Sequence, residues 1–461
     1  MVQLTDAPPS ARSSPDRISR FAQILGNLVP DATSASVILL LVVAGAALAL
    51  GTAPGAVVDA YYRGLWMLLP FTMQMTLILV LSAVVSGTPF FRRLVVALAL
   101  RPRTLTQVIV FSVLLNASAS YLYWGLGLAL GPVIAIHFAA SAEEKGIAVD
   151  FPFLLATVYA SQAVWQFGLS SSAPLLMATR GHFLESTVGV MDLRSTIWSA
   201  PAILMVVTFP IAVIVVARIL MPRQAMPLSR FPDAHALAAA DDASTATGDT
   251  GTTSGLAGWL ERSPLATAVL IATLLSWLYH HFVTKGNSLD LNAMNTMLLT
   301  VALALHRSPA AFSRAIRGAV TVCWPVLVLY HLYAGVAGLL QFTSVGERLA
   351  GAFAAWSTPL TFTFLTAAAS SIIAIFIPSS GGQWVVQGFV TSRAAAAVGT
   401  TAQHGLLAMS VGDHVGNMVS PFWPVLVAGI ARVDFRTFFG YGVVFGVVWF
   451  ALGVAIFTFV S

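Results

Sequence analysis

Long apolar runs separated by short polar stretches dominate this sequence of 461 residues. An α-helix needs about 20 apolar residues to cross the hydrocarbon layer of a bilayer, and several runs approach that length. The runs therefore predict an all-α polytopic membrane protein with the lipid bilayer as its solvent. The apolar segments are Thr33–Gly51, Leu65–Val85, Leu105–Phe138, Phe153–Met177, Ala200–Ala217, Leu265–Val283, Leu289–Leu305, Ala319–Phe342, Pro359–Phe389, Gln403–Ile430 and Phe438–Val460.

The composition agrees with a membrane location. Hydrophobic residues make up 57% of the chain and charged residues 9%, whereas soluble proteins carry roughly 25% charged residues. The single cysteine, Cys323, lies in an apolar run, which excludes a disulfide framework. In such a protein the net charge of +5 reports mainly on loop orientation, and it does not indicate nucleic-acid binding.

Polar stretches divide the chain into five parts. The first is polar, carries several arginines and lacks the apolar core of a signal peptide, so we expect a retained cytoplasmic tail. A central stretch holds prolines, then mostly Ala, Asp, Ser, Thr and Gly, which is typical of a flexible cytoplasmic linker. The expected parts are the tail (1–32), a first transmembrane repeat (33–220), the linker (221–263), a connecting transmembrane helix (264–288) and a second, inverted repeat (289–461).

The two halves share a pattern of interrupted apolar segments. In the first half, a long span with Tyr123–Gly127 precedes a span broken at Gly168–Pro174. In the second half, Ile377–Trp384 precedes a span broken at Gly416–Pro421. Paired Gly-, Pro- and Ser-interrupted segments are typical of inverted-repeat transporters whose binding site lies at the membrane midplane.

The basic residues test where the chain turns back. We expect re-entrant hairpins near 153–177 and 403–430. Following the chain from a cytoplasmic N-terminus then places 17 Lys and Arg residues inside and 6 outside, with Lys145 outside and Arg393 inside. This is a strong positive-inside bias. If the first hairpin crossed fully, the Arg218–Arg230 cluster would move outside, so we expect about nine crossing helices and two hairpins.

The interruptions supply a candidate anion site. Glycines let a substrate approach the backbone closely. Half-helix N-termini present unpaired N–H groups and a positive dipole end, and serine hydroxyls add donors. Such a site suits a small carboxylate, with tryptophans walling its acyl chain; the alternative is kinked helices packed against small residues, with tryptophan in the core. The candidate substrate-binding residues are Ser171, Ser172, Ser379, Ser380, Gly381, Gly382, Gln383, Trp384 and Trp124.

Two ionisable residues and two amides are candidates for ion coupling. Asp413 and His414 lie in an otherwise uncharged run beside Asn417, and Asn116 lies in the first half. Ionisable groups at membrane depth are costly and usually functional. Asp413 could take a proton, or a sodium ion could bind near Asn116 and Asn417. The alternatives are a wet structural position at a hairpin mouth, and interhelical hydrogen bonds for the amides. We expect no other cofactor.

Enzyme motifs are weak in this sequence. Gly168-Leu-Ser-Ser-Ser does not match Gly-x-Ser-x-Gly, and neither a zinc-protease motif nor a phosphate-binding loop occurs. An intramembrane serine hydrolase stays as an alternative, with Ser170–Ser172 or Ser379–Ser380 near Asp413 and His414. A channel would need a continuous polar pore, which the few intramembrane charges disfavour.

Several longer motifs resemble one family of transporters. They are Pro378–Gly388 (PSSGGQWVVQG), Gly412–Pro424 (GDHVGNMVSPFWP), Leu65–Met75 (LWMLLPFTMQM), Trp124–Gly127 (WGLG) and Ser172–Thr179 (SAPLLMAT). Together they resemble the bacterial short-chain fatty acid transporter family, within a wider ion-transporter superfamily of inverted repeats with hairpins. The resemblance covers nearly the whole chain apart from the tail and the linker.

The resemblance implies a function. Members of that family take up short-chain fatty acids, acetoacetate or butyrate among them, by secondary transport across the bacterial inner membrane. For this chain it implies symport with protons or sodium, and an N-terminus in the cytoplasm. The alternative is transport or exchange of another small organic anion. Superfamily relatives often pair through scaffold domains, so the resemblance also suggests a homodimer. It places binding at Ser171, Ser172, Ser379, Ser380, Gly381, Gly382 and Asn417.

Overall fold

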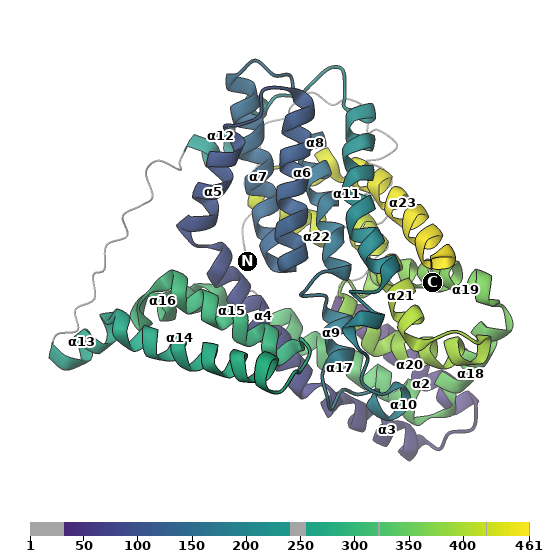
Figure 1. The fold of residues 1–461 in the computed structure, drawn as a ribbon. Helices are drawn as coiled ribbons and strands as arrows, with labels where there is room; N and C mark the ends of the chain where they lie inside the picture. Colours follow the sequence, from purple (N-terminus) through teal and green to yellow (C-terminus); the bar gives the residue numbers. More distant parts are fainter. Residues whose placement is uncertain (1–31, 240–254, 321–322, 421, 461) are drawn as a thin grey trace.

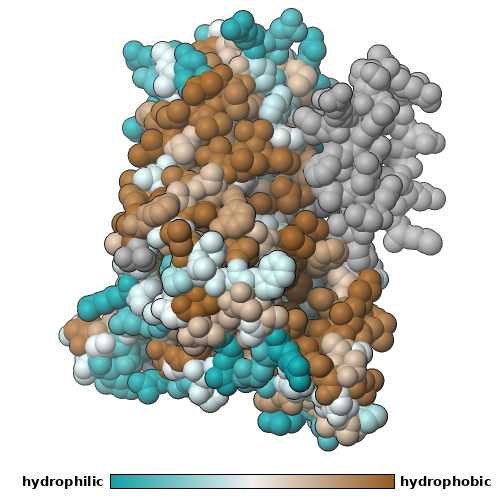
Figure 2. All heavy atoms as spheres, turned by 90° about the vertical axis from the view of Figure 1, so that its right-hand side faces the viewer, coloured by the Kyte–Doolittle hydropathy of each residue, from teal (hydrophilic) through white to brown (hydrophobic). Residues whose placement is uncertain are grey.

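The computed structural model describes residues 32–239, 255–320, 323–420 and 422–460, and these parts are built from helices without a strand. The expected all-α fold class is thus confirmed, whereas the expected tail lies almost wholly outside the described residues. Seven of the described helices are long and apolar enough to cross a membrane, or eight if a pair bent by 77° counts as one span. Figure 2 shows apolar side chains across the middle of one face, with polar ones at its upper end and along its lower part.

Each repeat contributes an equivalent set of helices. The first contains α2 (Ala32–Ala49), α3 (Pro54–Met67), α4 (Leu69–Ser86), α5 (Pro89–Ala99), α6 (Leu105–Leu122), α7 (Trp124–Glu144), α8 (Phe151–Ser161), η1 (Gln162–Phe167), α9 (Ser172–Ala178) and α11 (Ala200–Leu220). The second contains α15 (Leu291–His306), α16 (Pro309–Ala319), α17 (Trp324–Phe342), α18 (Ser344–Ala355), α19 (Pro359–Phe376), α20 (Ser380–Val398), α21 (Ala402–Val419), α22 (Phe422–Ala431) and α23 (Arg436–Phe459).

The packing repeats between the halves. Helix α2 packs on α17 as α15 packs on α4, and α5 packs on α7 as α18 packs on α20. Helix α6 packs on α8 as α19 packs on α21. The scaffold, as we use the word, consists of α2, α3, α4, α15 and α17. The bundle consists of the helices from α6 to α11 and from α19 to α23. In Figure 1, α6, α7, α8 and α11 stand in the upper half, whereas α2, α3 and α17 lie in the lower half.

The first hairpin consists of α6 and α7. Gly127 faces Ser120 and Gly131 faces Asn116, so the two helices run antiparallel. A single residue in extended conformation, Tyr123 (φ −158°, ψ 119°), joins them and forms the hairpin tip. Small residues at the contact allow the two arms to approach closely, as in many membrane helix pairs.

The second hairpin consists of α19 and α20. The Gln383 side-chain amide donates to the Ser370 carbonyl (2.9 Å), and the Gln387 amide donates to the Ser370 hydroxyl (2.8 Å). These bonds join residues about equally far from the link at Ile377–Ser379, as antiparallel arms require. Polar groups on the inner faces of the arms thus satisfy one another away from water.

The expected positions of the hairpins, near 153–177 and 403–430, are wrong. Those segments are broken helices, α8–η1–α9 and α21–α22, that pass onward. Helix α8 packs beside the first hairpin while α9 contacts α20 of the second; α21 packs beside the second hairpin while α22 contacts α7 of the first. The two broken helices therefore run in opposite directions, as inverted repeats require.

The charge count could not separate the two arrangements. Lys145 donates to the carbonyls of Leu100 (2.6 Å) and Pro102 (3.0 Å), so it lies on the side from which the first hairpin enters. Arg393 forms an ion pair with Glu347 (3.0 Å), on the side from which the second hairpin enters. Moving the hairpins exchanges only these two basic residues between the faces, so the count stays 17 to 6.

Nine crossings and two hairpins fit the described residues. The crossings are α2, α3–α4, α8–α9, α11, α14 (Pro264–Tyr279), α15, α17, α21–α22 and α23. A selection by length and hydropathy includes the hairpin arms α6, α7 and α19. It omits the first broken helix and α22, whose pieces are short, and α21, which is 18 residues long but rich in polar residues.

Part of the expected flexible linker is folded. Residues 221–239 include a short helix at Leu228–Arg230 and α12 (Pro232–Ala239), which packs on α7. The N–H of Met226 donates to the Asp150 carboxylate (3.0 Å), and the N–H of Ser229 donates to the Glu143 carboxylate (3.1 Å). The expectation of flexibility is wrong here because two acidic residues at the open end of the first hairpin bind the backbone of this segment. Residues 240–254 lie outside the described parts.

The scaffold is centred on a contact between two glycines. Helices α3 and α17 cross at Gly64 and Gly338, where a Cβ on Gly64 would stand 2.7 Å from the Cα of Gly338 and 2.4 Å from the Ala334 carbonyl oxygen. Only the absence of side chains permits this approach of one backbone to another.

The hairpin positions predict which loops share a face. In a Cys323→Ser background, we expect Glu144→Cys and Arg101→Cys to react with an impermeant thiol reagent from the same side of the membrane. Ala397→Cys and Arg348→Cys should react from the other side. If Glu144→Cys and Arg348→Cys instead reacted from the same side of the membrane, the hairpin positions expected from the sequence would be correct.

Candidate functional site

Four helix interruptions meet in the bundle. They are the two hairpin tips, at Tyr123 and Ile377–Ser379, and the breaks at Gly168–Ser171 and Ser420. Each interruption presents the C-terminus of one helix and the N-terminus of the next. Carbonyl groups at C-termini attract cations, and N–H groups at N-termini attract anions.

Two serines of the first broken helix bind the two hairpin tips. The N–H of Trp124, at the first tip, donates to the Ser170 hydroxyl oxygen (2.8 Å). The N–H of Gly381, at the second tip, donates to the Ser172 hydroxyl oxygen (3.0 Å). Ser172 Oγ thus occupies a position that suits a carboxylate oxygen, at the N-terminus of α20.

A tryptophan of the second broken helix also contacts both tips. The indole N–H of Trp423 donates to the Pro378 carbonyl (3.1 Å) at the second tip. Its ring meets Trp124 of the first tip edge to face, with centroids 6.2 Å apart. Together with the serine contacts, these interactions join the four interruptions in a closed ring.

The N-terminus of α20 is a partly satisfied donor site. Ser379 is its N-cap, and its hydroxyl accepts from the Gly382 N–H (3.3 Å). Ser380 is 1% exposed, and its hydroxyl has no hydrogen-bond partner. A hydroxyl buried in this way leaves a donor available for an incoming anion.

The scaffold covers this helix end. The hydroxyl of Tyr330, on α17, is hydrogen-bonded to the Ser379 hydroxyl (2.7 Å). The Tyr330 ring stacks on Phe71 of α4, with centroids 5.5 Å apart. A Cβ on Gly381 would stand 2.7 Å from the Phe71 ring, so this glycine is needed for the close fit between bundle and scaffold.

A second polar cluster surrounds Asp413. The side-chain amides of Gln166 and Asn417 both donate to Asp413 Oδ2, the second at 3.1 Å. One side-chain oxygen of each residue (Asp413 Oδ1, Gln166 Oε1 and Asn417 Oδ1) has no hydrogen-bond partner. Unpartnered oxygens on a carboxylate and on the two amides bonded to it are the type of ligand that a hard cation prefers, and the carboxylate can also take a proton. In the described residues no three His, Cys, Asp or Glu side chains come together as a metal-binding group.

The other ion-coupling candidates lie apart from this cluster. His414 faces α23 instead, where the centroid of its ring is 5.1 Å from that of Trp449 and neither ring nitrogen has a hydrogen-bond partner. Asn116 donates to the Val158 carbonyl (2.7 Å) on α8. The next residue, Tyr159, donates to the backbone carbonyl of Asn417 (2.9 Å). Helix α8 therefore contacts Asn116 of α6 and also the backbone of α21 at Asn417. Gln166, and not Asn116, is the amide that joins Asn417 at Asp413.

The substrate candidates also separate into groups. Ser172, Gly381 and their neighbours Ser379, Ser380 and Gly382 come together at the second tip. Ser171 donates to the Gln166 carbonyl (2.5 Å) and closes the end of η1. Trp124 lies at the first tip. Gln383 binds inside the second hairpin, and Trp384 is fully buried against Gly388 of its own helix.

Four residues at these sites were not among the sequence candidates: Gln166, Phe71, Tyr330 and Trp423. Gln166 carried a usable signal, because it is an amide two residues before the Gly168 break, as Asn417 is three residues before Ser420. The aromatic residues carried none, since aromatic side chains are ordinary in apolar helices.

The serine-hydrolase alternative gains no geometric support. A nucleophilic serine needs a base within hydrogen-bond reach. The His414 ring nitrogens have no hydrogen-bond partner, and the hydroxyls of Ser170 and Ser172 accept backbone N–H groups.

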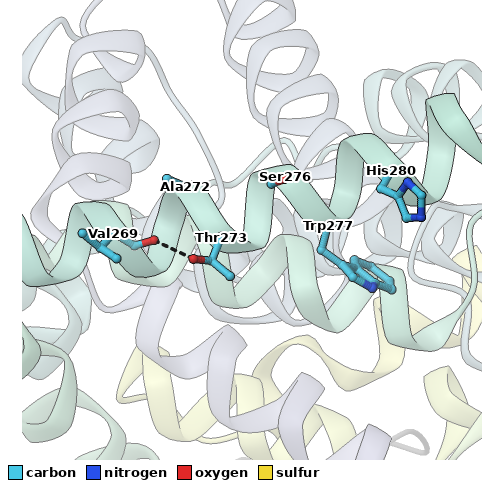
Figure 3. A pocket seen from close by; sticks show the side chains of 6 residues that line it. All are labelled: Val269, Ala272, Thr273, Ser276, Trp277 and His280. Carbon is cyan, nitrogen blue, oxygen red and sulfur yellow. Dashed lines mark hydrogen bonds between the residues drawn. The ribbon is translucent and has the colours of Figure 1, made fainter.

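A surface hollow of about 610 Å³ lies elsewhere, along α14. Figure 3 shows its lining side chains, from Val269 to His280, on one helix. The Thr273 hydroxyl bonds to the Val269 carbonyl (3.0 Å) of that same helix. The hollow is open and mostly apolar, so it offers no converging polar groups and we do not assign it to the site.

Sequence comparison agrees with this architecture. Residues 16–460 match the family model described as short chain fatty acid transporter. The chain belongs to the short-chain fatty acid transporter family. It is 28% identical over 446 residues to a protein of Escherichia coli K12, covering 96% of this chain and 99% of that one. It is 30% identical over 434 residues to a protein of Haemophilus influenzae, covering 92% and 95%. Both relatives are named provisionally as short-chain fatty acid transporters.

Two solved structures share the fold of this family member. The YdaH transporter of Alcanivorax borkumensis, described as having an unusual topology, matches with a TM-score of 0.53 and 16% identity over 94% of this chain and 97% of that one. MtrF of Neisseria gonorrhoeae, described among antimetabolite efflux pumps, matches with a TM-score of 0.55 and 15% identity over 94% and 96%. At this identity the likeness concerns the fold alone.

The packing that positions Asp413 predicts a stability change. A Cβ at the preceding Gly412 would stand 2.1 Å from the Ala367 carbonyl oxygen on α19. We expect Gly412→Ala to destabilise the protein by about 1–3 kcal/mol through overpacking, although alanine favours a helix by roughly 0.5–1 kcal/mol. Thermal unfolding in detergent measures this change. Gly351→Ala is the control, because nothing lies within 4 Å of its added Cβ, and equal melting temperatures for the two variants would contradict the packing.

Proposed function

We propose that this chain imports short-chain monocarboxylates, acetoacetate or butyrate among them, by symport with a monovalent cation. The carrying observation is that one bundle holds both an anion-suited helix N-terminus, at Ser380, and a cation-suited oxygen cluster, at Asp413. The membrane is the bacterial inner membrane, and the 17 to 6 distribution of basic residues favours a cytoplasmic N-terminus.

The anion would bind at the N-terminus of α20. The Ser380 hydroxyl is buried and unpartnered, and the N–H groups of Gly381 and Gly382 are held by serine hydroxyls that a carboxylate can replace. A carboxylate accepts more strongly than a neutral hydroxyl. The site contains no arginine or lysine, so binding is weak enough to be released after each crossing.

The cation would bind at Asp413, between the two repeats. Gln166 comes from the first repeat, whereas Asp413 and Asn417 come from the second. One carboxylate balances one positive charge, so a proton or a sodium ion leaves the cluster neutral. A divalent ion would leave an uncompensated buried charge, which is costly at membrane depth.

The two sites would be coupled electrostatically. An ionised Asp413 and a bound carboxylate repel each other within the same low-dielectric bundle. A cation at Asp413 removes most of this repulsion, so cation and substrate favour each other's binding, and by linkage the effect is reciprocal.

Movement would occur between bundle and scaffold. The scaffold is fixed at the Gly64–Gly338 contact, whereas hydroxyl groups connect it to the hairpin tips. Tyr330 bonds to Ser379, and Tyr123 donates to the Ile78 carbonyl on α4. A few such bonds can break and re-form as the bundle moves by rocking or by an elevator motion.

The anion site predicts that Ser380→Ala weakens transport. Losing a hydrogen bond to a charged group costs about 1.5–3 kcal/mol, so we expect the KM for labelled butyrate in proteoliposomes to rise roughly 10- to 100-fold. The control is Ser357→Ala, since this hydroxyl bonds only within its own helix end. An unchanged KM for butyrate in Ser380→Ala would remove Ser380 from the site.

The cation site predicts that Asp413→Asn separates transport from its driving gradient. Uptake of labelled acetoacetate and butyrate is measured under an imposed proton gradient and, separately, a sodium gradient. We expect the wild type to accumulate substrate under one of them, and Asp413→Asn to lose accumulation while keeping passive exchange. Asp434→Asn is the control, because that carboxylate caps an exposed helix start. Accumulation by Asp413→Asn equal to the wild type would exclude this site as the coupling site.

A further inference from the structure

Trp423 contacts both hairpin tips and borders the proposed carboxylate site. Its N–H bonds to Pro378, two residues before Ser380, and its ring meets that of Trp124. Trp124 in turn lies 6.1 Å from Trp165, centroid to centroid, just before the first break. Three indoles from two repeats therefore form one cluster, which we call the indole cluster.

The indole cluster is slightly less enclosed than the other tryptophans of the bundle core. Trp124 and Trp165 each keep 8% of their surface accessible, and Trp423 is only partly buried. Trp384 and Trp449 are 0% exposed. The indole cluster therefore keeps a small accessible surface beside the interruptions, which Trp384 and Trp449 lack.

The other side of the carboxylate site is closed. The Phe71 ring lies so near Gly381 that an added Cβ would stand 2.7 Å from it, and Tyr330 stacks on Phe71. An acyl chain attached to a carboxylate at Ser380 cannot extend toward the scaffold in this arrangement. On the other side of the same tip, Trp423 bonded to Pro378 is the large side chain that such an acyl chain would meet.

We propose that Trp423, supported by Trp124 and Trp165, sets the longest acyl chain that the transporter accepts. This inference rests on the proposed function. The indole N–H bond to Pro378 fixes the wall relative to the carboxylate site, so the distance available to the chain is defined. Each methylene buried against the wall contributes about 0.8 kcal/mol, roughly a fourfold gain per carbon, until the chain reaches the ring.

The test is a competition series. Straight-chain acids of two, four, six and eight carbons compete with labelled butyrate for binding to the purified full chain in proteoliposomes. In the wild type, affinity should rise with length and then fall. In Trp423→Ala the fall should move by two or more carbons, with the preference for octanoate over butyrate raised at least tenfold. Trp423→Phe keeps a ring but loses the N–H donor, so its limit should lie between the two.

The control is Trp356→Ala on α18, where the indole is 85% exposed; its profile should match the wild type. Normal butyrate binding with an unshifted length limit in both Trp423 variants would overturn the inference and leave the proposed function standing. Absence of binding of any acid by folded wild-type protein would overturn both. The phenylalanine variant keeps the test decisive if the alanine variant does not fold.

Discussion

Backbone groups in hydrocarbon must find hydrogen-bond partners within the protein, and the architecture of the bundle depends on this requirement. Each of the four interruptions frees N–H and carbonyl groups that no helix satisfies. The interruptions satisfy one another: Ser170 accepts from Trp124, Ser172 accepts from Gly381, and the Trp423 indole donates to Pro378. Two of these bonds join a hairpin tip to the broken helix of its own repeat, and the Ser172–Gly381 bond joins the two repeats. The site exists where it does because that is where the unsatisfied groups meet.

The same requirement leaves a limited set of groups for ligands. Donors remain at the N-terminus of α20, and acceptor oxygens remain around Asp413. The donors and the acceptor oxygens are thus separate within one bundle, and the proposed symport depends on this separation. Neither site uses a basic side chain, so the electrostatic balance changes only when the cargo arrives or leaves.

Much of this arrangement could be predicted from the sequence, and the failures have physical reasons. The interruptions and the buried polar residues Ser172, Ser380 and Asp413 could be picked out from the sequence because polar residues are conspicuous in apolar runs. The hairpin positions were not readable, since exchanging Lys145 and Arg393 leaves the charge distribution unchanged. Tyr330 and Trp423 act through contacts between distant segments, and no local pattern distinguishes them from aromatic residues in the core.

The crossing of α3 and α17 has a consequence for how the two repeats can diverge. Gly64 and Gly338 touch each other, one from each repeat, with backbone atoms on both sides of the contact. A side chain added at either position cannot be accommodated by a smaller residue at the other, because the other position already holds glycine, the smallest residue. The close approach of the two helices therefore depends on glycine at both positions. A substitution at either glycine would have to be accompanied by a separation of α3 from α17, and hence by a change in the scaffold itself.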